Sequence, residues 1–272
     1  MKTAVGTTGK LGEYKLLIRG YPLPEIIENL TFGEALFLLI KGRLADDKEG
    51  RMMDVLLNGI LEYEGAPTWS LARATAGCQP DNFILPTIAS LTSIGPVTVS
   101  PQLTCALVDA ASDRMKREGL SINEMAKTII KEYDERKERI PGFGHPWFPL
   151  PQGDPRTNKV LEIAEKLGIA GEKTKLFKAI HDEFIKEPKR ATMTINIDGA
   201  IGCTMADMGF MPLETIAVAV ISTMAGTVAH VAEVNRSKGG MMAAIEVLTP
   251  EFKWEYVGEP ERHLPPNKKR KI

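Results

Sequence analysis

The first residue whose surroundings favour chemistry is a histidine inside a long irregular segment. His145 follows Pro-Gly-Phe-Gly and precedes two prolines and two aromatic residues. The two glycines permit positive φ angles and expose backbone N–H groups, while the prolines stiffen the chain. A histidine held in this way can donate a hydrogen bond to an oxygen that gains negative charge during a reaction. The alternative is a structural histidine that only caps a turn.

A second candidate is an aspartate that ends an apolar stretch. Asp198 closes the segment Ala-Thr-Met-Thr-Ile-Asn-Ile-Asp (191–198), and Gly199 follows it. A carboxylate beside apolar residues loses hydration, which raises its pKa and makes it a better proton acceptor. The alternative, and the commoner role for such a residue, is an N-cap that accepts hydrogen bonds from the free N–H groups of the next helix.

A third candidate is an arginine behind a predicted helix start. Pro155 at the first helical position makes Asp154 a natural N-cap. Arg156 then projects from the first turn and could bind a carboxylate through two parallel N–H bonds, although a surface arginine is the usual outcome. Of the other histidines, His230 in an apolar helix is expected to be structural, and His181 in a polar stretch is expected to be solvated.

The elements that must hold these residues are predominantly helical. Apolar residues recur at helical spacing along most of the chain, and no alternation of strands with helices is visible. Two capping boxes mark helix starts, one at Thr31 with Glu34 and one at Ser121 with Glu124. The pattern predicts an all-α architecture.

Three segments interrupt or qualify that pattern. The stretch 140–156 is rich in proline and glycine, which predicts an irregular and usually functional loop. The alternating Thr and Ile of 191–198 predict a short strand. The apolar segment 212–236 predicts a long helix with a break near Gly226.

Composition excludes several classes of function. The 272 residues carry 34 Lys and Arg against 35 Asp and Glu, so no net charge attracts nucleic acid or an acidic membrane. Three cysteines without paired spacing, and no metal-ligand spacing, favour reduced thiols and no metal. We expect no membrane span, because no run approaches about 20 apolar residues, and no signal peptide. The prediction is therefore a cytoplasmic protein, with a solvated basic tail.

Taken together, these motifs resemble the citrate synthase superfamily. The stretch from Ile140 to His145, followed by Asp154-Pro155-Arg156, is similar to its substrate-histidine loop, and 195–199 is similar to its catalytic aspartate segment. The resemblance covers about residues 17–264. The length is that of citryl-CoA lyases and of the lyase module of ATP-citrate lyase. Further matching segments are Arg19–Pro22, Ala225-Gly226 with Ala229-His230 and Glu233, and Tyr256–Gly258.

The resemblance implies a fold and an assembly. It implies an all-α, citrate-synthase-like chain with large and small helical domains, a cleft between them that holds the active site, and a homodimer. By position, residues 1–105 and 205–272 would form the large domain, the latter with the C-terminal tail. Residues 106–204 would form the small domain that binds coenzyme A.

The resemblance also implies roles for individual residues. Asp198 would be the base that takes a proton from an acyl-CoA thioester, His145 would bond the keto or hydroxyl oxygen, and Arg156 would bind the substrate carboxylate. The partner substrate would be a small carboxylic or keto acid, and the chemistry leaves room for a partner acid–CoA ligase. The adenine of coenzyme A would meet backbone groups of Pro141, Gly142, Phe143 and Gly144.

Departures from the family pattern leave three hypotheses. Tyr63-Glu64-Gly65 replaces an Asp-His pair, Ser100–Thr104 replaces His-Gly-Gly, and two citrate-binding arginines align with Thr223 and with Glu251 or Phe252. The favoured hypothesis is carbon–carbon cleavage or formation on a citryl-CoA-like substrate whose acid carries fewer carboxylates than citrate. The others are a noncatalytic acyl-CoA-binding regulatory homologue and a subunit of a larger lyase complex.

Overall fold

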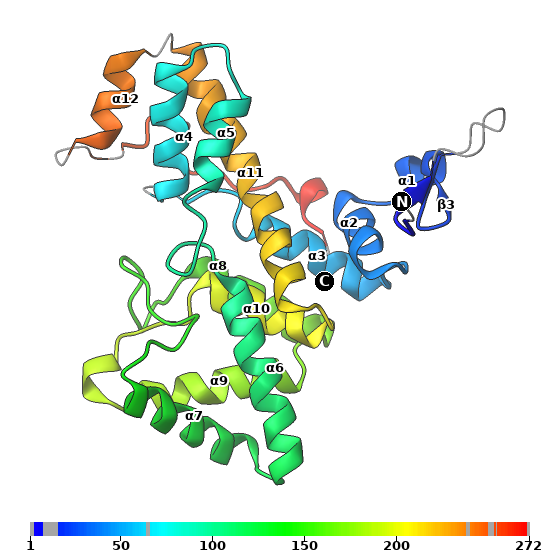
Figure 1. The fold of residues 1–272 in the computed structure, drawn as a ribbon, viewed down its shortest axis with the longest axis vertical. Coiled ribbons are helices and arrows are strands. Elements are labelled where there is room, and N and C mark those ends of the chain that lie inside the picture. The colour runs from blue at the N-terminus through cyan, green and yellow to red at the C-terminus, as the bar shows by residue number, and fades with distance from the viewer. Residues whose placement is uncertain are drawn as a thin grey trace. The chain divides into compact units, whose positions relative to one another are not determined.

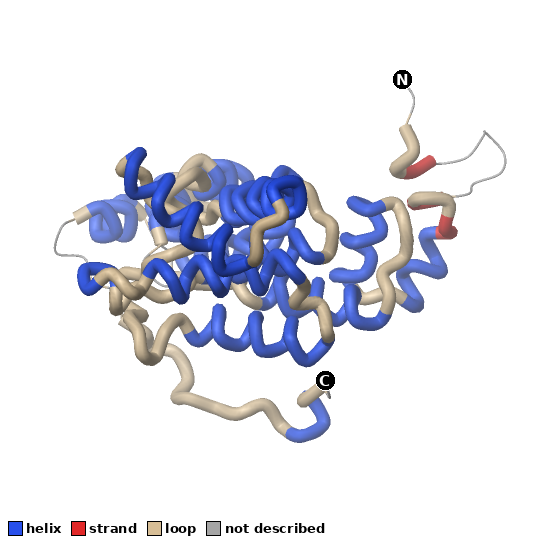
Figure 2. Tube along the Cα trace, turned by 90° about the horizontal axis from the view of Figure 1, so that it is seen from below, coloured by secondary structure: helices blue, strands red, loops and turns tan. Residues whose placement is uncertain are grey.

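The computed structural model describes residues 3–7, 16–63, 66–237, 240–249, 253 and 255–270. Within these ranges the chain forms twelve α-helices, two short 3₁₀ helices and three two-residue strands (Figure 1). Helices dominate the trace (Figure 2), so the predicted all-α class is confirmed. The departures at Glu64, Gly65, Glu251 and Phe252 lie outside the described residues.

The chain divides into two compact units, Met1–Gly59 with Ser100–Ala219, and Ile60–Val99 with Val220–Ile272. The predicted large and small domains have other boundaries than these two units, and that division stays a prediction. Each unit is described by itself below. Every candidate residue named for chemistry lies in the first unit.

The first unit opens with a small antiparallel sheet followed by three helices. Its strands are β1 (Gly6–Thr7), β2 (Leu17–Ile18) and β3 (Tyr21–Pro22), with Leu17 opposite Pro22. Arg19 turns the chain between β2 and β3 at a φ of 51°, and its guanidinium donates to the Leu39 carbonyl at 2.6 and 3.0 Å. The helices that follow are α1 (Leu23–Asn29), α2 (Phe32–Lys41) and α3 (Asp47–Asn58).

Both predicted capping boxes are confirmed. The Thr31 hydroxyl accepts from the Glu34 amide, and the Glu34 carboxylate accepts from the Thr31 amide at 2.7 Å. Ser121 and Glu124 form the same reciprocal pair at the start of α7 (Ile122–Arg136). These bonds are local in sequence, so side-chain chemistry alone decides them.

Five helices form the part of the first unit that positions the candidate site. They are α6 (Pro101–Glu118), α7 (Ile122–Arg136), α8 (Pro155–Leu167), α9 (Glu172–Phe184) and α10 (Ile197–Asp207). In this group α10 packs on α6, α8 and α9, while α7 packs on α9 (Figure 1). Helix α10 is almost wholly buried, because its residues are small or apolar on every side.

Carboxylate bonding fixes the far end of α10 to α9. The Asp207 side chain accepts from the backbone N–H groups of Gly171, Lys173 and Thr174 at 2.8, 3.0 and 2.9 Å. It therefore caps α9 from another helix, since Gly171 has no side chain to do so. The C-terminal end of α10 is thus held to the start of α9 by hydrogen bonds.

The second unit contains α4 (Pro67–Cys78), α5 (Ile84–Leu91), α12 (Met241–Leu248) and the later part of α11 (Pro212–Arg236). Helix α11 is continuous, so the predicted break near Gly226 is wrong. A Cβ at Gly226 would lie 2.3 Å from the Leu61 carbonyl oxygen and 2.6 Å from Trp69 Nε1. The glycine therefore serves close packing, not a break.

His230 joins a polar group on the second unit. Its Nε2 lies 3.2 Å from Glu62 Oε1 and its Nδ1 lies 3.4 Å from Arg73, which also pairs with Glu233. The ring stands 6.1 Å from Trp69. These contacts agree with the structural role expected for His230.

Two further expectations need correction. Helix α11 is long and apolar enough to cross a membrane by length and composition, against the expectation that no segment would be, although a core helix of a soluble protein passes the same test. The predicted strand at 191–198 is absent, because only Ile195 pairs, in an isolated bridge with Phe143, and α10 already begins at Ile197. Alternating β-branched residues favour an extended segment that packs on a surface, but they do not provide the neighbouring strand that a sheet needs.

Candidate functional site

The predicted irregular loop is confirmed, and hydrogen bonds anchor it to the segment before α10. The Gly144 amide donates to the Thr194 carbonyl at 2.7 Å, and the Asn196 amide donates to the Gly142 carbonyl at 2.9 Å. The Asn196 side chain adds a bond to the Gly144 carbonyl at 3.1 Å, and Leu150 N–H bonds the Thr192 carbonyl at 2.8 Å. The loop is irregular, yet four hydrogen bonds join its backbone to residues 192–196.

Gly142 allows the loop to approach α6 and α10 closely. Its φ is 83°, and a Cβ there would lie 2.6 to 2.7 Å from Thr104 Oγ1, Gly199 Cα and Phe177 Cζ. Gly144 has a φ of 91° with open space around it. Only glycine fits the first position on both grounds, and the second needs glycine for its φ alone.

Phe143 fastens the loop to α9. Its ring stacks on Phe177 and lies against Phe184, both at 4.9 Å between centroids, and meets His181 edge-on at 5.1 Å. His181 is buried and its Nε2 lies 2.9 Å from the Met193 carbonyl, so the expectation of a solvated histidine is wrong. Burial lowers the pKa of His181.

The structure brings three of the predicted residues into direct contact. Asp154 caps α8, accepting from the Arg156 amide at 2.9 Å, and it also receives Arg156 Nε at 3.0 Å and Nη2 at 2.7 Å. Arg156 Nη2 in turn lies 3.3 Å from His145 Nε2. Asp154 is fully buried, and the arginine is only partly exposed.

This geometry changes what Arg156 can offer a ligand. One edge of its guanidinium is already used by Asp154, whose negative charge offsets that of the arginine. A ligand that reaches Arg156 would therefore meet a cation whose charge Asp154 already balances in part.

The protonation state of His145 follows from its contacts. Burial lowers the pKa of this imidazole, Asp154 raises it and the charge of Arg156 lowers it further. The Trp147 amide donates to Nδ1 at 3.2 Å, and Arg156 Nη2, which can only donate, lies 3.3 Å from Nε2. The lowered pKa favours the neutral imidazole, and a donor faces each of its two ring nitrogens.

Asp198 lies in the first turn of α10 but does not cap it. The cap is Asn196, whose Oδ1 accepts from the Gly199 amide at 3.0 Å, so the capping alternative for Asp198 is wrong. The Oδ1 atom of Asp198 is buried and has no hydrogen-bond partner among the described residues. Burial raises the pKa of Asp198 to about 6, against hydrogen bonding from Ser100 and the charge of Arg156, which lower it. Such a carboxyl can both accept and return a proton near neutral pH.

Ser100 is a neighbour of Asp198 that sequence reasoning missed as a functional residue. The sequence drew attention to this position only because a histidine is expected there. Ser100 precedes Pro101 at the start of α6, is 8% exposed and makes no side-chain cap bond to its own helix. The signal available in the sequence was the serine and proline at a helix start, which ordinarily indicates a simple cap.

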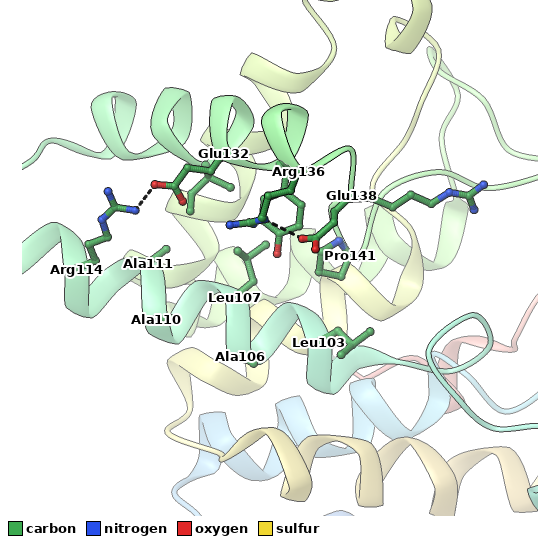
Figure 3. A pocket seen from close by; sticks show the side chains of 13 residues that line it. Leu103, Ala106, Leu107, Ala110, Ala111, Arg114, Glu132, Arg136, Glu138 and Pro141 are labelled. Atoms are coloured by element: carbon green, nitrogen blue, oxygen red, sulfur yellow. Dashed lines mark hydrogen bonds and ion pairs between the residues drawn. The ribbon is translucent and has the colours of Figure 1, made fainter.

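A pocket of about 680 Å³ opens beside the first residue of the loop motif, Pro141 (Figure 3). Its floor is apolar and comes from α6, and its rim carries three arginines. Arg114 pairs with Glu132 at 2.6 Å and Arg136 with Glu138 at 2.9 Å, while Arg139 makes no ion pair within the described part of the chain. The pocket is lined by Leu103, Ala106, Leu107, Ala110, Ala111, Arg114, Ile129, Glu132, Tyr133, Arg136, Glu138, Arg139 and Pro141.

Thr223 provides no cation, and the described residues form no metal site. Thr223, where the family pattern has an arginine, is buried and donates to the Val220 carbonyl at 2.9 Å. In the described ranges no three His, Cys, Asp or Glu side chains cluster so that they could hold a metal ion. Cys78, Cys105 and Cys203 are free thiols.

The fold agrees with comparisons to known proteins. The family model for the citrate synthase C-terminal domain matches residues 50–243, and the chain belongs to that family. Among curated proteins, none matches the chain.

Solved structures give the same fold. A citryl-CoA lyase from Hydrogenobacter thermophilus is 27% identical with a TM-score of 0.78, and the match covers 98% of each chain. An ATP citrate lyase from Methanosaeta concilii, in complex with (3S)-citryl-CoA, is 16% identical over 89% of this chain and 40% of its own, with a TM-score of 0.71. A citrate synthase from Thermoplasma acidophilum, in complex with carboxymethyl coenzyme A and oxaloacetate, is 20% identical over 88% and 60%, with a TM-score of 0.65.

Proposed function

We propose that this protein breaks or makes a carbon–carbon bond next to the thioester of an acyl-CoA, as a citryl-CoA lyase or citrate synthase does. The observation that carries the proposal is Asp198, a carboxyl with a buried, unbonded oxygen and a pKa of about 6. Its neighbour Arg156 touches His145 at 3.3 Å, which supports one site composed of a base and two oxygen-binding donors. We assign the lyase direction with a citryl-CoA-like substrate as the first hypothesis.

The proposed condensation balances in protons and electrons. Asp198 removes a proton from the carbon next to the thioester, and the electron pair of that C–H bond forms the new C–C bond to the keto carbon. The keto oxygen becomes an alkoxide, which takes the ring N–H proton of His145. Asp198 then releases its proton to solvent and His145 regains one. Cleavage is the same sequence reversed, with protonated Asp198 returning a proton to carbon.

Coenzyme A is the proposed second substrate, held beside the loop. The Gly142 carbonyl and both backbone groups of Gly144 are already bonded inside the protein. In this bridge register the N–H and C=O of Phe143 face away from Ile195, so they are the groups we assign to the adenine, next to Pro141. The adjoining pocket has an apolar floor for a ring and Arg139 for a phosphate.

The acid partner is proposed to carry fewer carboxylates than citrate. Arg156 is a cation 3.3 Å from His145, and Asp154 already occupies one edge of its guanidinium. Thr223 supplies no positive charge. A partner acid–CoA ligase would supply the thioester for cleavage.

A homodimer in the cytoplasm, bound to neither membrane nor nucleic acid, is the proposed assembly and setting. On the second unit α5 exposes Ile84, Leu85 and Ile88, and α12 exposes Met241 and Met242. Apolar faces of this kind usually mark a protein interface. Sedimentation at micromolar concentration tests the dimer, and a monomer would contradict it.

Turnover with defined substrates tests the function. Purified full-length protein is incubated with acetyl-CoA plus oxaloacetate, pyruvate or glyoxylate, and separately with citryl-CoA, and products are identified by mass spectrometry. We expect cleavage or condensation that Asp198→Asn abolishes and that Asp113→Asn, at an exposed position of α6, leaves unchanged.

The other outcomes discriminate the alternatives. Tight coenzyme A binding without turnover would favour a noncatalytic regulatory homologue, and turnover only after a second protein is added would favour a subunit of a larger lyase complex. Absence of both binding and turnover would contradict the proposal.

A further inference from the structure

Helix α10 rests on the first turn of α6 through a glycine that lies four residues after Asp198. A Cβ at Gly202 would lie 2.5 Å from the Pro101 carbonyl oxygen, 2.7 Å from Thr104 Cβ and 3.0 Å from the Cys105 amide. Residues four apart on a helix share one face. Asp198 therefore lies on the face of α10 that meets the start of α6.

The residue at that start is Ser100, and its own helix does not use its side chain. It occupies the N-cap position with a φ of −133° and a ψ of 44°, and its hydroxyl makes no cap bond. The preceding Val99 has a φ of 53°, which is rare for a β-branched residue. Ser100, 8% exposed and without a cap bond to its own helix, therefore lies at the end of α6 that meets the Asp198 face of α10. Its backbone and its hydroxyl both lower the pKa of Asp198.

We propose that Ser100 is the positioning residue of the base: its N–H and hydroxyl hold the Asp198 carboxylate, leaving Oδ1 as the oxygen that exchanges the proton. This deepens the proposed function and rests on it for the identity of the reaction. It assigns a role to the position where the family pattern has a histidine, a role of orienting the base and not of binding the thioester oxygen.

The charged groups around Asp198 support this division of labour. Arg156 from α8 favours the carboxylate, Asp154 opposes it and Ser100 from α6 favours it through both its backbone and its hydroxyl. Burial is the largest influence and acts in the opposite direction. Ser100 therefore keeps the base ionisable near neutral pH without placing a second charge beside it.

A titration of the Asp198 carboxyl tests the proposal without reliance on turnover. Full-length protein labelled with ¹³C at aspartate carboxyls is titrated by NMR, and Asp198→Asn assigns the signal. Ser100→Ala is expected to raise the pKa of Asp198 from about 6 toward 7, because one donor to the charged form is lost. Ser100→Thr, which keeps the hydroxyl, is expected to retain a pKa of about 6.

A matched control separates this role from simple packing. Ser112 lies on the same helix, is fully buried and donates to Glu172 at 2.6 Å, so Ser112→Ala removes an equally buried hydroxyl away from Asp198. It should leave the titration of Asp198 unchanged. An unchanged or lowered pKa of Asp198 in a folded Ser100→Ala protein would overturn the proposal.

The kinetic readout keeps the two proposals distinguishable. In the condensation direction the acid limb of the kcat/KM profile of Ser100→Ala should move up with the pKa, and threonine should restore it. A shifted titration in a protein that turns over no thioester would support the positioning role while contradicting the proposed function. Normal turnover with an unshifted titration and an unshifted pH profile would do the reverse.

Discussion

The starts of α8 and α10 each carry an aspartate in or beside the first turn, and the two carboxylates have opposite surroundings. Asp154 is fully buried, and an amide and two guanidinium nitrogens donate to it. Asp198 has a buried oxygen with no partner among the described residues, and Asn196 does the capping in its place. Both oxygens of the first carboxylate accept hydrogen bonds, whereas Oδ1 of the second has no partner among the described residues.

This difference teaches how the two roles can be told apart. A capping carboxylate is stabilised in its charged form by the N–H groups it accepts from. A carboxylate that lies beside a cap but is not the cap is also buried, yet it does not accept hydrogen bonds from those N–H groups. In the sequence Asn-Ile-Asp-Gly, the capping residue Asn196 thus lies two residues before the proposed base Asp198.

The sharpest way to break the comparison is Asp198→Asn. Loss of a general acid–base group typically costs about 10²–10⁴-fold in rate, and we expect a fall in kcat of that size with the fold retained. Stopped-assay mass spectrometry measures the rate, and circular dichroism checks the fold. A well-folded variant with full activity would show that Asp198 is not the base.

The converse change at α8 should mainly affect stability. Asp154→Ala removes both the carboxylate that pairs with the partly buried Arg156 and the cap of α8, so we expect a loss of about 3–5 kcal/mol in unfolding free energy. Asp154→Asn keeps the cap and should cost about 1 kcal/mol less. Urea denaturation measures both, and equal losses would mean that the cap contributes nothing.

A substitution at Arg156 tests whether this arginine, although paired with Asp154, still binds substrate. Arg156→Ala should raise the KM of the acid partner about 10–100-fold, since a hydrogen bond to a charged group contributes about 1.5–3 kcal/mol. The KM of the acyl-CoA should change little. Arg156→Lys should recover only part of the loss because lysine lacks the planar fork. An unchanged KM for every acid would show that Arg156 serves Asp154 alone.

The last expected effect concerns the free energy of unfolding, which the ionised form of Asp198 lowers. Because folding raises the pKa of Asp198 from 3.8 to about 6, the folded state binds that proton more tightly, and stability from this group falls as pH rises through that window. At pH 7 Asp198→Asn should be more stable than the native protein by up to about 3 kcal/mol, since the shift is about 2.2 pKa units at about 1.4 kcal/mol each, and below about pH 3 the difference should vanish. Denaturation curves at the two pH values measure this, and a difference independent of pH would contradict a raised pKa.

The features that sequence predicted correctly are local ones. The Thr31–Glu34 and Ser121–Glu124 boxes depend on residues three apart, and the irregular loop depends on its own prolines and glycines. Gly226 and His181 were interpreted wrongly because their surroundings come from distant segments, namely Trp69 for the glycine and Phe143 for the histidine. Neither contact leaves a trace in the neighbouring sequence.

The candidate site shows the same limit. His145, Asp154 and Arg156 lie in one loop and helix start, so they are close in sequence, and in the structure Arg156 contacts both of the others. The predicted strand at 191–198 failed because alternation cannot tell a strand from an extended segment that fastens a loop. Ser100 remained unseen because it reaches Asp198 only when α6 packs on α10.

The anchoring of the loop to residues 192–196 has a consequence for experiments that report local opening. The amides of Gly144, Leu150 and Asn196 lie outside any helix or strand, yet each donates to a backbone carbonyl at 2.7 to 2.9 Å. In deuterium exchange these amides should retain their protons like core amides, and proteases should spare a segment whose proline and glycine content suggests easy cleavage. A ligand that binds here would therefore meet a surface already set in place, and the binding step would carry little cost of ordering the protein.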